Sequence, residues 1–136
     1  MKVLVYGTLK RDKGNNGRLR NAEYIRDAIV DDFKLFQVGF PVAWPNEGTG
    51  ITGEIWDIGN PEEDHMAKET LRGLDALEGY REHNRDSSMY LREPVITRCG
   101  EHVHMYVGNP KTWRRLEEEC TFENGLYTWD YANRGW

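Results

Sequence analysis

The sequence has no hydrophobic run long enough to cross a membrane and no excess of basic residues. A membrane-spanning helix needs about 20 consecutive apolar residues, whereas the apolar run at residues 2–6 is too short even for the core of a secretory signal peptide. The 136 residues include 18 Lys and Arg but 23 Asp and Glu, which gives a net charge of −5. Nucleic acids and anionic membranes bind basic surfaces, so we expect neither as a partner and predict a cytoplasmic protein.

Cysteine is scarce, and the motifs of several enzyme classes are absent. Cys99 and Cys120 lack both close spacing and an export signal, so we predict reduced thiols and assign them no role. There is no P-loop, no GxSxG motif and no HExxH motif. His102 and His104 lie two residues apart on one face of a predicted strand, as a metal pair could, but no third ligand has a suitable spacing and a structural role is favoured. We therefore expect no metal ion and no organic cofactor.

Short apolar stretches predict a single, β-rich domain. A chain of 136 residues makes one domain, and five Trp, seven Tyr and four Phe supply bulk for its core. Residues 2–6 (KVLVY) predict a buried strand that ends in a turn at Gly7 and Thr8, followed by a polar, Gly-rich loop at residues 10–20. Further β-branched and aromatic stretches lie at residues 22–30, 32–38, 51–58, 89–98 and 101–107. They predict a mostly antiparallel sheet that curls towards a barrel.

One segment has the pattern of an amphipathic helix. Asn60, Pro61 and Glu63 are typical of an N-cap, a first helical position and a capping box, and apolar residues follow at spacings of three and four. Gly79 is a typical stop signal, so we predict a helix over residues 61–78. A second, weaker helix is predicted over residues 111–119, and residues 120–136 are aromatic without a clear period.

Two local features suggest chemistry. Asp75 and Glu78 fall in the last turn of the predicted helix, where the negative end of the helix dipole disfavours acidic side chains. A carboxyl held there and partly buried has a raised pKa, which suits a general acid or base near neutral pH; a solvated acid at a helix end is the alternative. The turn at residues 6–9 contains a glycine, and its backbone N–H groups could bind an anion, although an ordinary turn at a strand end fits the same residues.

Charge is distributed unevenly along the chain. Residues 1–20 contain one acid and six basic residues, which are Lys2, Lys10, Arg11, Lys13, Arg18 and Arg20. They form a local positive field in an acidic protein, which fits either a surface for a small anionic ligand or a solvated loop.

Six short blocks occur in a defined order between residues 3 and 107. They are residues 5–11 (VYGTLKR), Asn15, 39–41 (GFP), 53–58 (GEIWDI), 74–80 (LDALEGY) and 90–92 (YLR). In this order they resemble the gamma-glutamylcyclotransferase-like family, and most closely its gamma-glutamylamine cyclotransferase branch. Relatives often have a Gly and a His where this chain has Asp12 and Asn16, and residues 111–136 form a C-terminal extension outside the resemblance.

The resemblance implies a fold, a reaction and a site. The expected fold is α+β, a mixed, barrel-like sheet with one main helix and a pocket at one end. The expected enzyme, classed as a transferase or lyase, converts a gamma-glutamyl amine, amino acid or peptide to 5-oxoproline when the α-amine attacks its own γ-carbonyl. The matching site residues are the acid/base Glu78 and the substrate-binding residues Tyr6, Gly7, Thr8, Leu9 and Tyr90.

The chemistry of these residues agrees with that reaction. One carboxylate with a raised pKa can take a proton from the attacking amine and return one to the leaving nitrogen, and backbone N–H groups can stabilise the oxyanion without a metal. The basic loop could hold the substrate's α-carboxylate, while Glu54 and Asp75 are assigned structural roles. We expect a small gamma-glutamyl substrate and a monomer. Two alternatives remain: a non-catalytic module that binds a small ligand or a protein in the same pocket, and a nucleic-acid binder that uses the basic loop.

Overall fold

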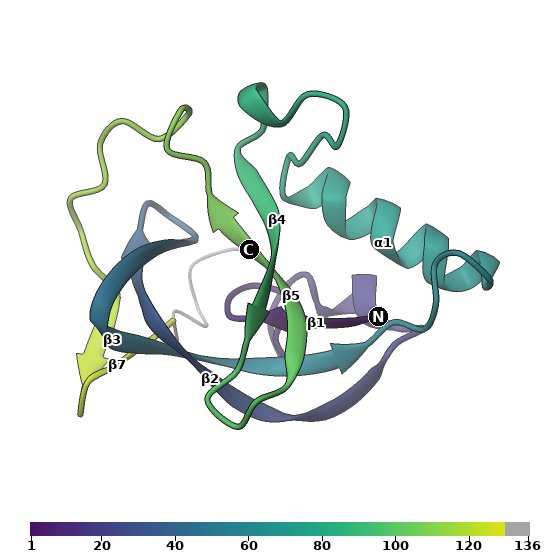
Figure 1. The fold of residues 1–136 in the computed structure, drawn as a ribbon, viewed down its shortest axis with the longest axis horizontal. Helices are drawn as coiled ribbons and strands as arrows, with labels where there is room; N and C mark the ends of the chain where they lie inside the picture. The colour runs from purple at the N-terminus through teal and green to yellow at the C-terminus, as the bar shows by residue number, and fades with distance from the viewer. Residues whose placement is uncertain (130–136) are drawn as a thin grey trace.

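The computed structural model describes residues 1–129, and within them a curled sheet of seven strands packs against one α-helix (Figure 1). The strands are β1 (Lys2–Val5), β2 (Glu23–Gln37), β3 (Pro41–Asp57), β4 (Tyr90–Ile96), β5 (His102–Gly108), β6 (Thr121–Glu123) and β7 (Leu126–Thr128). Helix α1 spans His65–Leu77, and two short 3-10 helices span Asn16–Leu19 and Arg85–Ser87.

Strand β3 is the centre of the sheet because it pairs with three neighbours. It is antiparallel to β1 and β2 and parallel to β7. The strand order is β4-β5-β1-β3-β7-β6, with β2 paired to β3 outside this path, and β1 also pairs in parallel with β5. Within residues 1–129 the end strands β4 and β6 do not pair with each other, so the sheet curls without closing. The expected mixed, barrel-like α+β fold with one main helix is therefore confirmed.

Strands β2 and β3 are longer than their sequence patterns predict. The two strands expected at residues 22–30 and 32–38 are one strand, interrupted by an irregularity in register between Asp31 and Phe33, where Asp32 has a φ of 67°. Strand β3 begins at Pro41, ten residues before the expected position 51. Its first half contains proline and glycine, which are poor strand formers, but it pairs with β2 from Pro41 onward. Cross-strand pairing therefore overrides local propensity.

Three glycines in β3 have the GxGxxG spacing of a dinucleotide-binding loop. That motif requires a turn from a strand into a helix, whereas Gly48, Gly50 and Gly53 lie within an antiparallel strand. A Cβ on Gly53 would lie 2.7 Å from the carbonyl oxygen of Val5 and 2.7 Å from a methyl carbon of Leu4. This glycine therefore allows β1 to approach β3 closely.

Helix α1 begins four residues later than predicted. Its N-cap is Asp64, whose carboxylate accepts a hydrogen bond of 2.9 Å from the Met66 N–H. The expected cap, Asn60, instead accepts from the Glu62 N–H in a turn that precedes the helix. The predicted stop at Gly79 is confirmed, because this residue has a φ of 63° and follows the C-cap directly. No helix in residues 1–129 is long and apolar enough to span a membrane.

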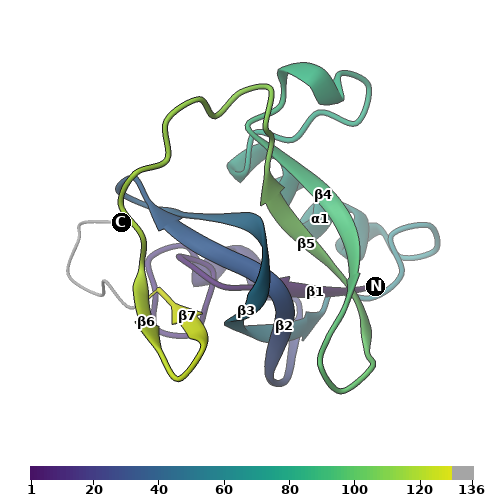
Figure 2. The same ribbon diagram turned by 60° about the vertical axis from the view of Figure 1, so that its left-hand side comes forward.

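The helix predicted over residues 111–119 is wrong. After β5 the chain makes a turn at residues 110–112 and continues without a helix to β6 at the opposite end of the sheet, as Figure 2 shows. Its backbone joins the end of β2, because Gln37 N–H donates to Glu118 O at 2.6 Å and Cys120 N–H donates to Leu35 O at 2.9 Å. Pairing with the sheet thus replaces helical hydrogen bonds. The chain then forms the β6–β7 hairpin, and residues 130–136 of the predicted aromatic tail lie outside the described residues.

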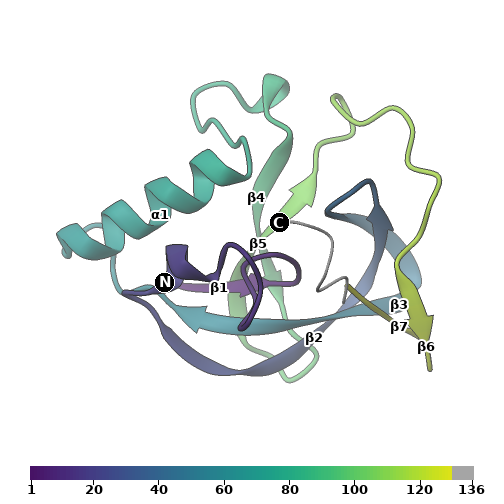
Figure 3. The same ribbon diagram turned by 180° about the vertical axis from the view of Figure 1, so that it is seen from behind.

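Two hydrophobic clusters pack on opposite sides of β1. Val3 and Val5 belong to the cluster that includes Leu74 of α1, whereas Leu4 and Tyr6 belong to the cluster that includes Trp129. Figure 3 shows the helix on one side of the strand. Successive side chains of a strand point to opposite faces, so β1 is buried on both sides. The turn that follows β1 is consequently held between two packed layers.

Candidate active site

A cavity of about 260 Å³ lies where β1 ends. Its walls come from β1 and the turn after it, the β2–β3 turn, the end of α1, and strands β4 and β5. The lining residues are Leu4, Val5, Tyr6, Gly7, Thr8, Leu9, Asn15, Phe40, Pro41, Leu77, Glu78, Met89, Tyr90 and Tyr106. All six site residues named from the sequence therefore line one cavity.

Glu78 is the C-cap of α1, and its side chain faces the cavity. Its carboxylate receives no hydrogen bond from residues 1–129, so nothing there compensates the removal of the charge from water. Burial raises the pKa of this carboxyl from its usual value near 4.5 to about 7. Near neutral pH Glu78 is thus divided between its acid and base forms.

The other two candidate carboxylates are engaged in contacts with the protein. Asp75 accepts hydrogen bonds from Arg92 Nη1 at 2.5 Å and from the Tyr106 hydroxyl at 2.6 Å. Glu54, with an exposed fraction of 7%, accepts from the backbone N–H and Nε of Arg11 and from the indole of Trp56. Neither lines the cavity. Their contacts agree with the structural roles assigned from the sequence.

The turn that lines the cavity has backbone N–H groups without a hydrogen-bond partner in residues 1–129. The N–H groups of Gly7, Thr8 and Leu9 donate no hydrogen bond within residues 1–129, whereas the three carbonyl oxygens of the same residues accept one each. A buried N–H without a partner is uncommon in native proteins, so these donors remain available to an oxygen atom of a ligand. This is the arrangement expected of an anion or oxyanion site.

Gly7 is required by packing and not by backbone conformation. Its φ lies outside the left-handed region. A Cβ at this position would lie 2.4 Å from Cγ of Pro41, which also lines the cavity. Any side chain here must therefore displace either the turn or the cavity wall.

The two positions that differ from the family pattern, Asp12 and Asn16, lie in the loop that follows the turn. Asp12 has a φ of 64°, a conformation that glycine adopts easily and that aspartate tolerates. The Asn16 amide donates to the Leu9 carbonyl at 2.8 Å, and the Asn15 amide donates to Thr8 Oγ1 at 2.9 Å. The loop after the turn is therefore fastened to it by side-chain amides.

The basic loop does not reach the cavity. Among residues 1–129, no Lys or Arg side chain lines it. The Arg11 guanidinium lies 3.8 Å above the Tyr24 ring and binds Glu54, and Lys10 Nζ donates to the Trp129 carbonyl at 2.7 Å. The expectation that this loop holds a substrate carboxylate is not supported by these contacts.

Three tyrosines surround Glu78, and each donates its hydroxyl proton elsewhere. Tyr6 donates to the Tyr106 carbonyl at 2.6 Å, Tyr90 donates to the Pro41 carbonyl at 2.8 Å, and Tyr106 donates to Asp75. Burial raises the pKa of Tyr6 and Tyr90 well above the usual value, so both are neutral near pH 7. The tyrosines therefore leave Glu78 as the titrating group of the cavity.

The cavity lining includes residues that sequence reasoning missed. Met89 is 40% exposed, and its carbonyl accepts from the Trp113 indole at 2.8 Å. The Trp113 ring packs edge-on against Phe40 and Tyr90, with centroids 5.9 and 6.1 Å apart. Phe40 lies in the block at residues 39–41 that resembles the family, so its place in the site was detectable from the sequence. No sequence pattern pointed to Tyr106 or Met89.

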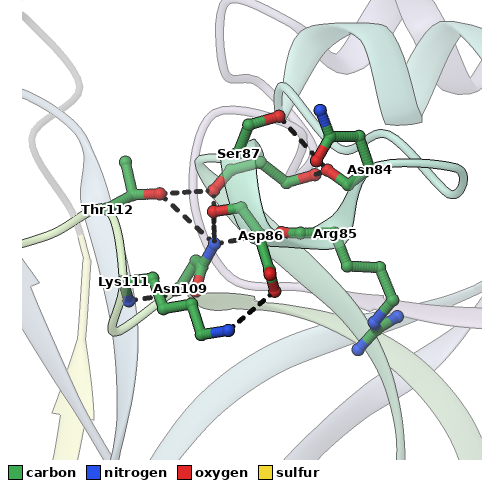
Figure 4. Close-up of polar contacts among 8 residues, drawn as sticks. Asn84, Arg85, Asp86, Ser87, Asn109, Lys111 and Thr112 are labelled. Carbon is green, nitrogen blue, oxygen red and sulfur yellow. Dashed lines mark hydrogen bonds and ion pairs between the residues drawn. The ribbon is translucent and has the colours of Figure 1, made fainter.

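The loop that precedes Met89 is anchored by one buried amide. Asn109, 2% exposed, donates through Nδ2 to the carbonyls of Arg85 and Ser88, at 3.1 and 2.8 Å (Figure 4). Lys111 adds an ion pair with Asp86 at 2.8 Å. These contacts tie residues 85–88, which directly precede the lining residue Met89, to the residues that follow β5.

The possible metal ligands and thiols lie apart from the cavity. His102 is exposed and His104 is partly buried, and residues 1–129 contain no cluster of three or more His, Cys, Asp or Glu side chains arranged to hold a metal ion. Cys99 is exposed and Cys120 is buried, and both are free thiols.

A family model and curated relatives identify the family of this chain. The model of the family described as "Gamma-glutamyl cyclotransferase, AIG2-like" matches residues 3–129. The gamma-glutamylcyclotransferase family protein YtfP of Escherichia coli K12 is 36% identical over 78 residues, which are 57% of this chain and 61% of that protein. The match thus spans about three fifths of the relative's length.

Solved structures have the same fold. The solution structure of ytfP from Escherichia coli has 28% sequence identity to this chain and superposes with a TM-score of 0.60. The match covers 93% of this chain and 96% of the ytfP chain. A solved gamma-glutamyl cyclotransferase has 19% sequence identity and a TM-score of 0.54. The match covers 88% of this chain and 70% of that protein's chain, and it shows a similarity of fold alone.

Proposed function

Because this chain belongs to the AIG2-like gamma-glutamyl cyclotransferase family, we propose that it is a cyclotransferase whose acid/base is Glu78. The substrate is a small gamma-glutamyl amine, amino acid or peptide. Its α-amine attacks its own γ-carbonyl, a new C–N bond closes the five-membered ring, and the bond to the original amide nitrogen breaks. The products are 5-oxoproline and the free amine.

The observation that carries this proposal is a single titratable carboxyl beside unused donors. Glu78, with a pKa of about 7, lines the same cavity as the free N–H groups of Gly7, Thr8 and Leu9. The carboxylate accepts the proton that the attacking amine loses, and the resulting acid protonates the leaving nitrogen. The N–H groups stabilise the negative charge that develops on the γ-carbonyl oxygen. Tyr6 and Tyr90, neutral and held by their own hydrogen bonds, shape the cavity around the substrate.

The proposal is tested with a panel of gamma-glutamyl amines, amino acids and dipeptides, with 5-oxoproline quantified by mass spectrometry. Glu78→Gln should abolish turnover, whereas the matched control Glu69→Gln, on the exposed face of α1, should retain it. Saturable binding of these compounds without 5-oxoproline formation would instead favour the non-catalytic binding module. Turnover by Glu78→Gln near the normal rate would refute the assignment of the acid/base. The cytoplasmic location and the monomeric state remain predictions.

A further inference from the structure

The end of α1 that carries Glu78 is attached to the sheet through Asp75. This residue lies one helical turn before Glu78, and its carboxylate receives the Tyr106 hydroxyl from β5 and the Arg92 guanidinium from β4. Its backbone carbonyl accepts from the Tyr80 N–H at 2.9 Å, just after the helix ends. Donors from three segments therefore converge on one residue.

Tyr106 extends this attachment to the other side of the cavity. Its side chain binds Asp75, and its backbone carbonyl accepts the hydroxyl of Tyr6 at 2.6 Å. Tyr6 is the first residue of the turn that lines the cavity, and Tyr106 lines the cavity as well. A continuous set of hydrogen bonds thus connects the turn, through Tyr106 and Asp75, to the helix end. We call Tyr6, Tyr106 and Asp75 the brace.

The position of Asp75 is unfavourable for an acid. The last turn of a helix exposes carbonyl oxygens and repels negative charge. The ion pair with Arg92, whose side chain is 12% exposed, offsets this repulsion. Arg92 also lies over the Tyr80 ring at 5.0 Å and so holds the segment that follows Glu78. The contacts of Asp75 accordingly act on the backbone on both sides of Glu78.

We propose that Asp75 and Tyr106 are positioning residues that set the distance between the Glu78 carboxylate and the backbone donors of the turn. This inference rests on the proposed function, since it assigns a purpose to the placement of Glu78. Proton transfer needs a defined donor–acceptor distance, and a displacement of about 1 Å can reduce the rate about 100-fold. Neither Asp75 nor the hydroxyl of Tyr106 takes part in the proton transfers.

The charged and titratable groups around Glu78 make its position measurable without substrate. Tyr6 from the turn, Tyr90 from β4 and Tyr106 from β5 each interact with its charge, and Asp75 is neutralised by Arg92. If the brace loosens, water reaches the carboxylate and its pKa falls towards the ordinary value.

The test uses Tyr106→Phe, Asp75→Asn and the double variant. Each single variant should lower kcat about 10- to 100-fold with little change in KM. The double variant should be no less active than the less active of the two single variants, because both substitutions weaken the same contact between positions 75 and 106. The control is Asp31→Asn, which removes an ion pair with Arg98 of 2.7 Å at a site outside the cavity and should leave kcat unchanged.

A second measurement separates this inference from the proposed function. In protein with ¹³C-labelled Glu side chains, the Glu78 carboxyl should titrate near 7 in the wild type and at a lower pH in Tyr106→Phe, independently of any turnover. A drop in melting temperature with unchanged kcat and unchanged Glu78 titration would overturn the positioning role. An inactive wild type would refute the proposed function, and the titration would still decide the brace. If Asp75→Asn fails to fold, Tyr106→Phe provides both readouts.

Discussion

The Glu78 carboxyl should make the protein less stable as the pH rises, and Glu78→Gln should remove this penalty. A carboxyl with a pKa of about 7 in the folded protein and near 4.5 in the unfolded chain opposes folding once it ionises. At pH 4 both states are largely protonated and the penalty is small. It grows between pH 4.5 and 7, and at pH 8 it reaches about 3 kcal/mol, since one pKa unit corresponds to about 1.4 kcal/mol.

Chemical denaturation of wild type and variant at several pH values measures this effect. The free-energy cost of removing the glutamine amide from water is the same at every pH. It therefore cancels when the stability difference between variant and wild type at pH 4 is subtracted from the stability difference at pH 8. We expect Glu78→Gln to gain about 3 kcal/mol over the wild type between these two pH values. Glu69→Gln, on the exposed face of the helix, should gain little. An equal stability difference at pH 4 and pH 8 would refute the conclusion that burial raises the pKa of Glu78.

Three other outcomes follow from the same cavity. The value of kcat/KM should fall as the pH drops through about 7. This acidic inflection of the pH profile should stay in place when substrates with different amine pKa values shift the alkaline inflection. An acidic inflection at or below pH 4.5 would show that the pKa of Glu78 is not raised. Gly7→Val should lose turnover because its Cβ would lie 2.4 Å from Pro41 Cγ, and a fully active variant would exclude the turn as the oxyanion site. Chelation should leave the rate intact; a rate lost on chelation and restored by zinc would instead implicate His102 and His104.

The parts of the site that could be predicted from sequence are those encoded locally. The turn after β1 and the acid at the end of α1 each lie within a short block of consecutive residues, so their pattern survives without knowledge of the fold. Tyr106 could not be found in this way. Its role depends on β5 pairing in parallel with β1 and on Asp75 approaching from α1, and no sequence spacing reports either contact.

The errors in secondary structure have a similar origin. Asn60 and Asp64 are both good N-cap residues, and only the backbone of the preceding turn selects the second. The segment at residues 111–119 has charges and spacing that suit a helix, but its backbone pairs with the end of β2, and Trp113 packs against Phe40 and Tyr90, which line the cavity. In each case a tertiary contact outweighs a weak local preference.

The parallel pairing of β1 with β5 has a consequence for the order in which the protein assembles. The β2–β3 hairpin joins neighbouring segments and closes early, whereas Val3 lies opposite His104, about 100 residues along the chain. Strand β1 is therefore expected to dock late and to detach early. The turn at residues 6–9 follows β1 directly, so the cavity forms only in that last step. A ligand held by the turn opposes the first step of unfolding, and should slow unfolding far more than it accelerates folding.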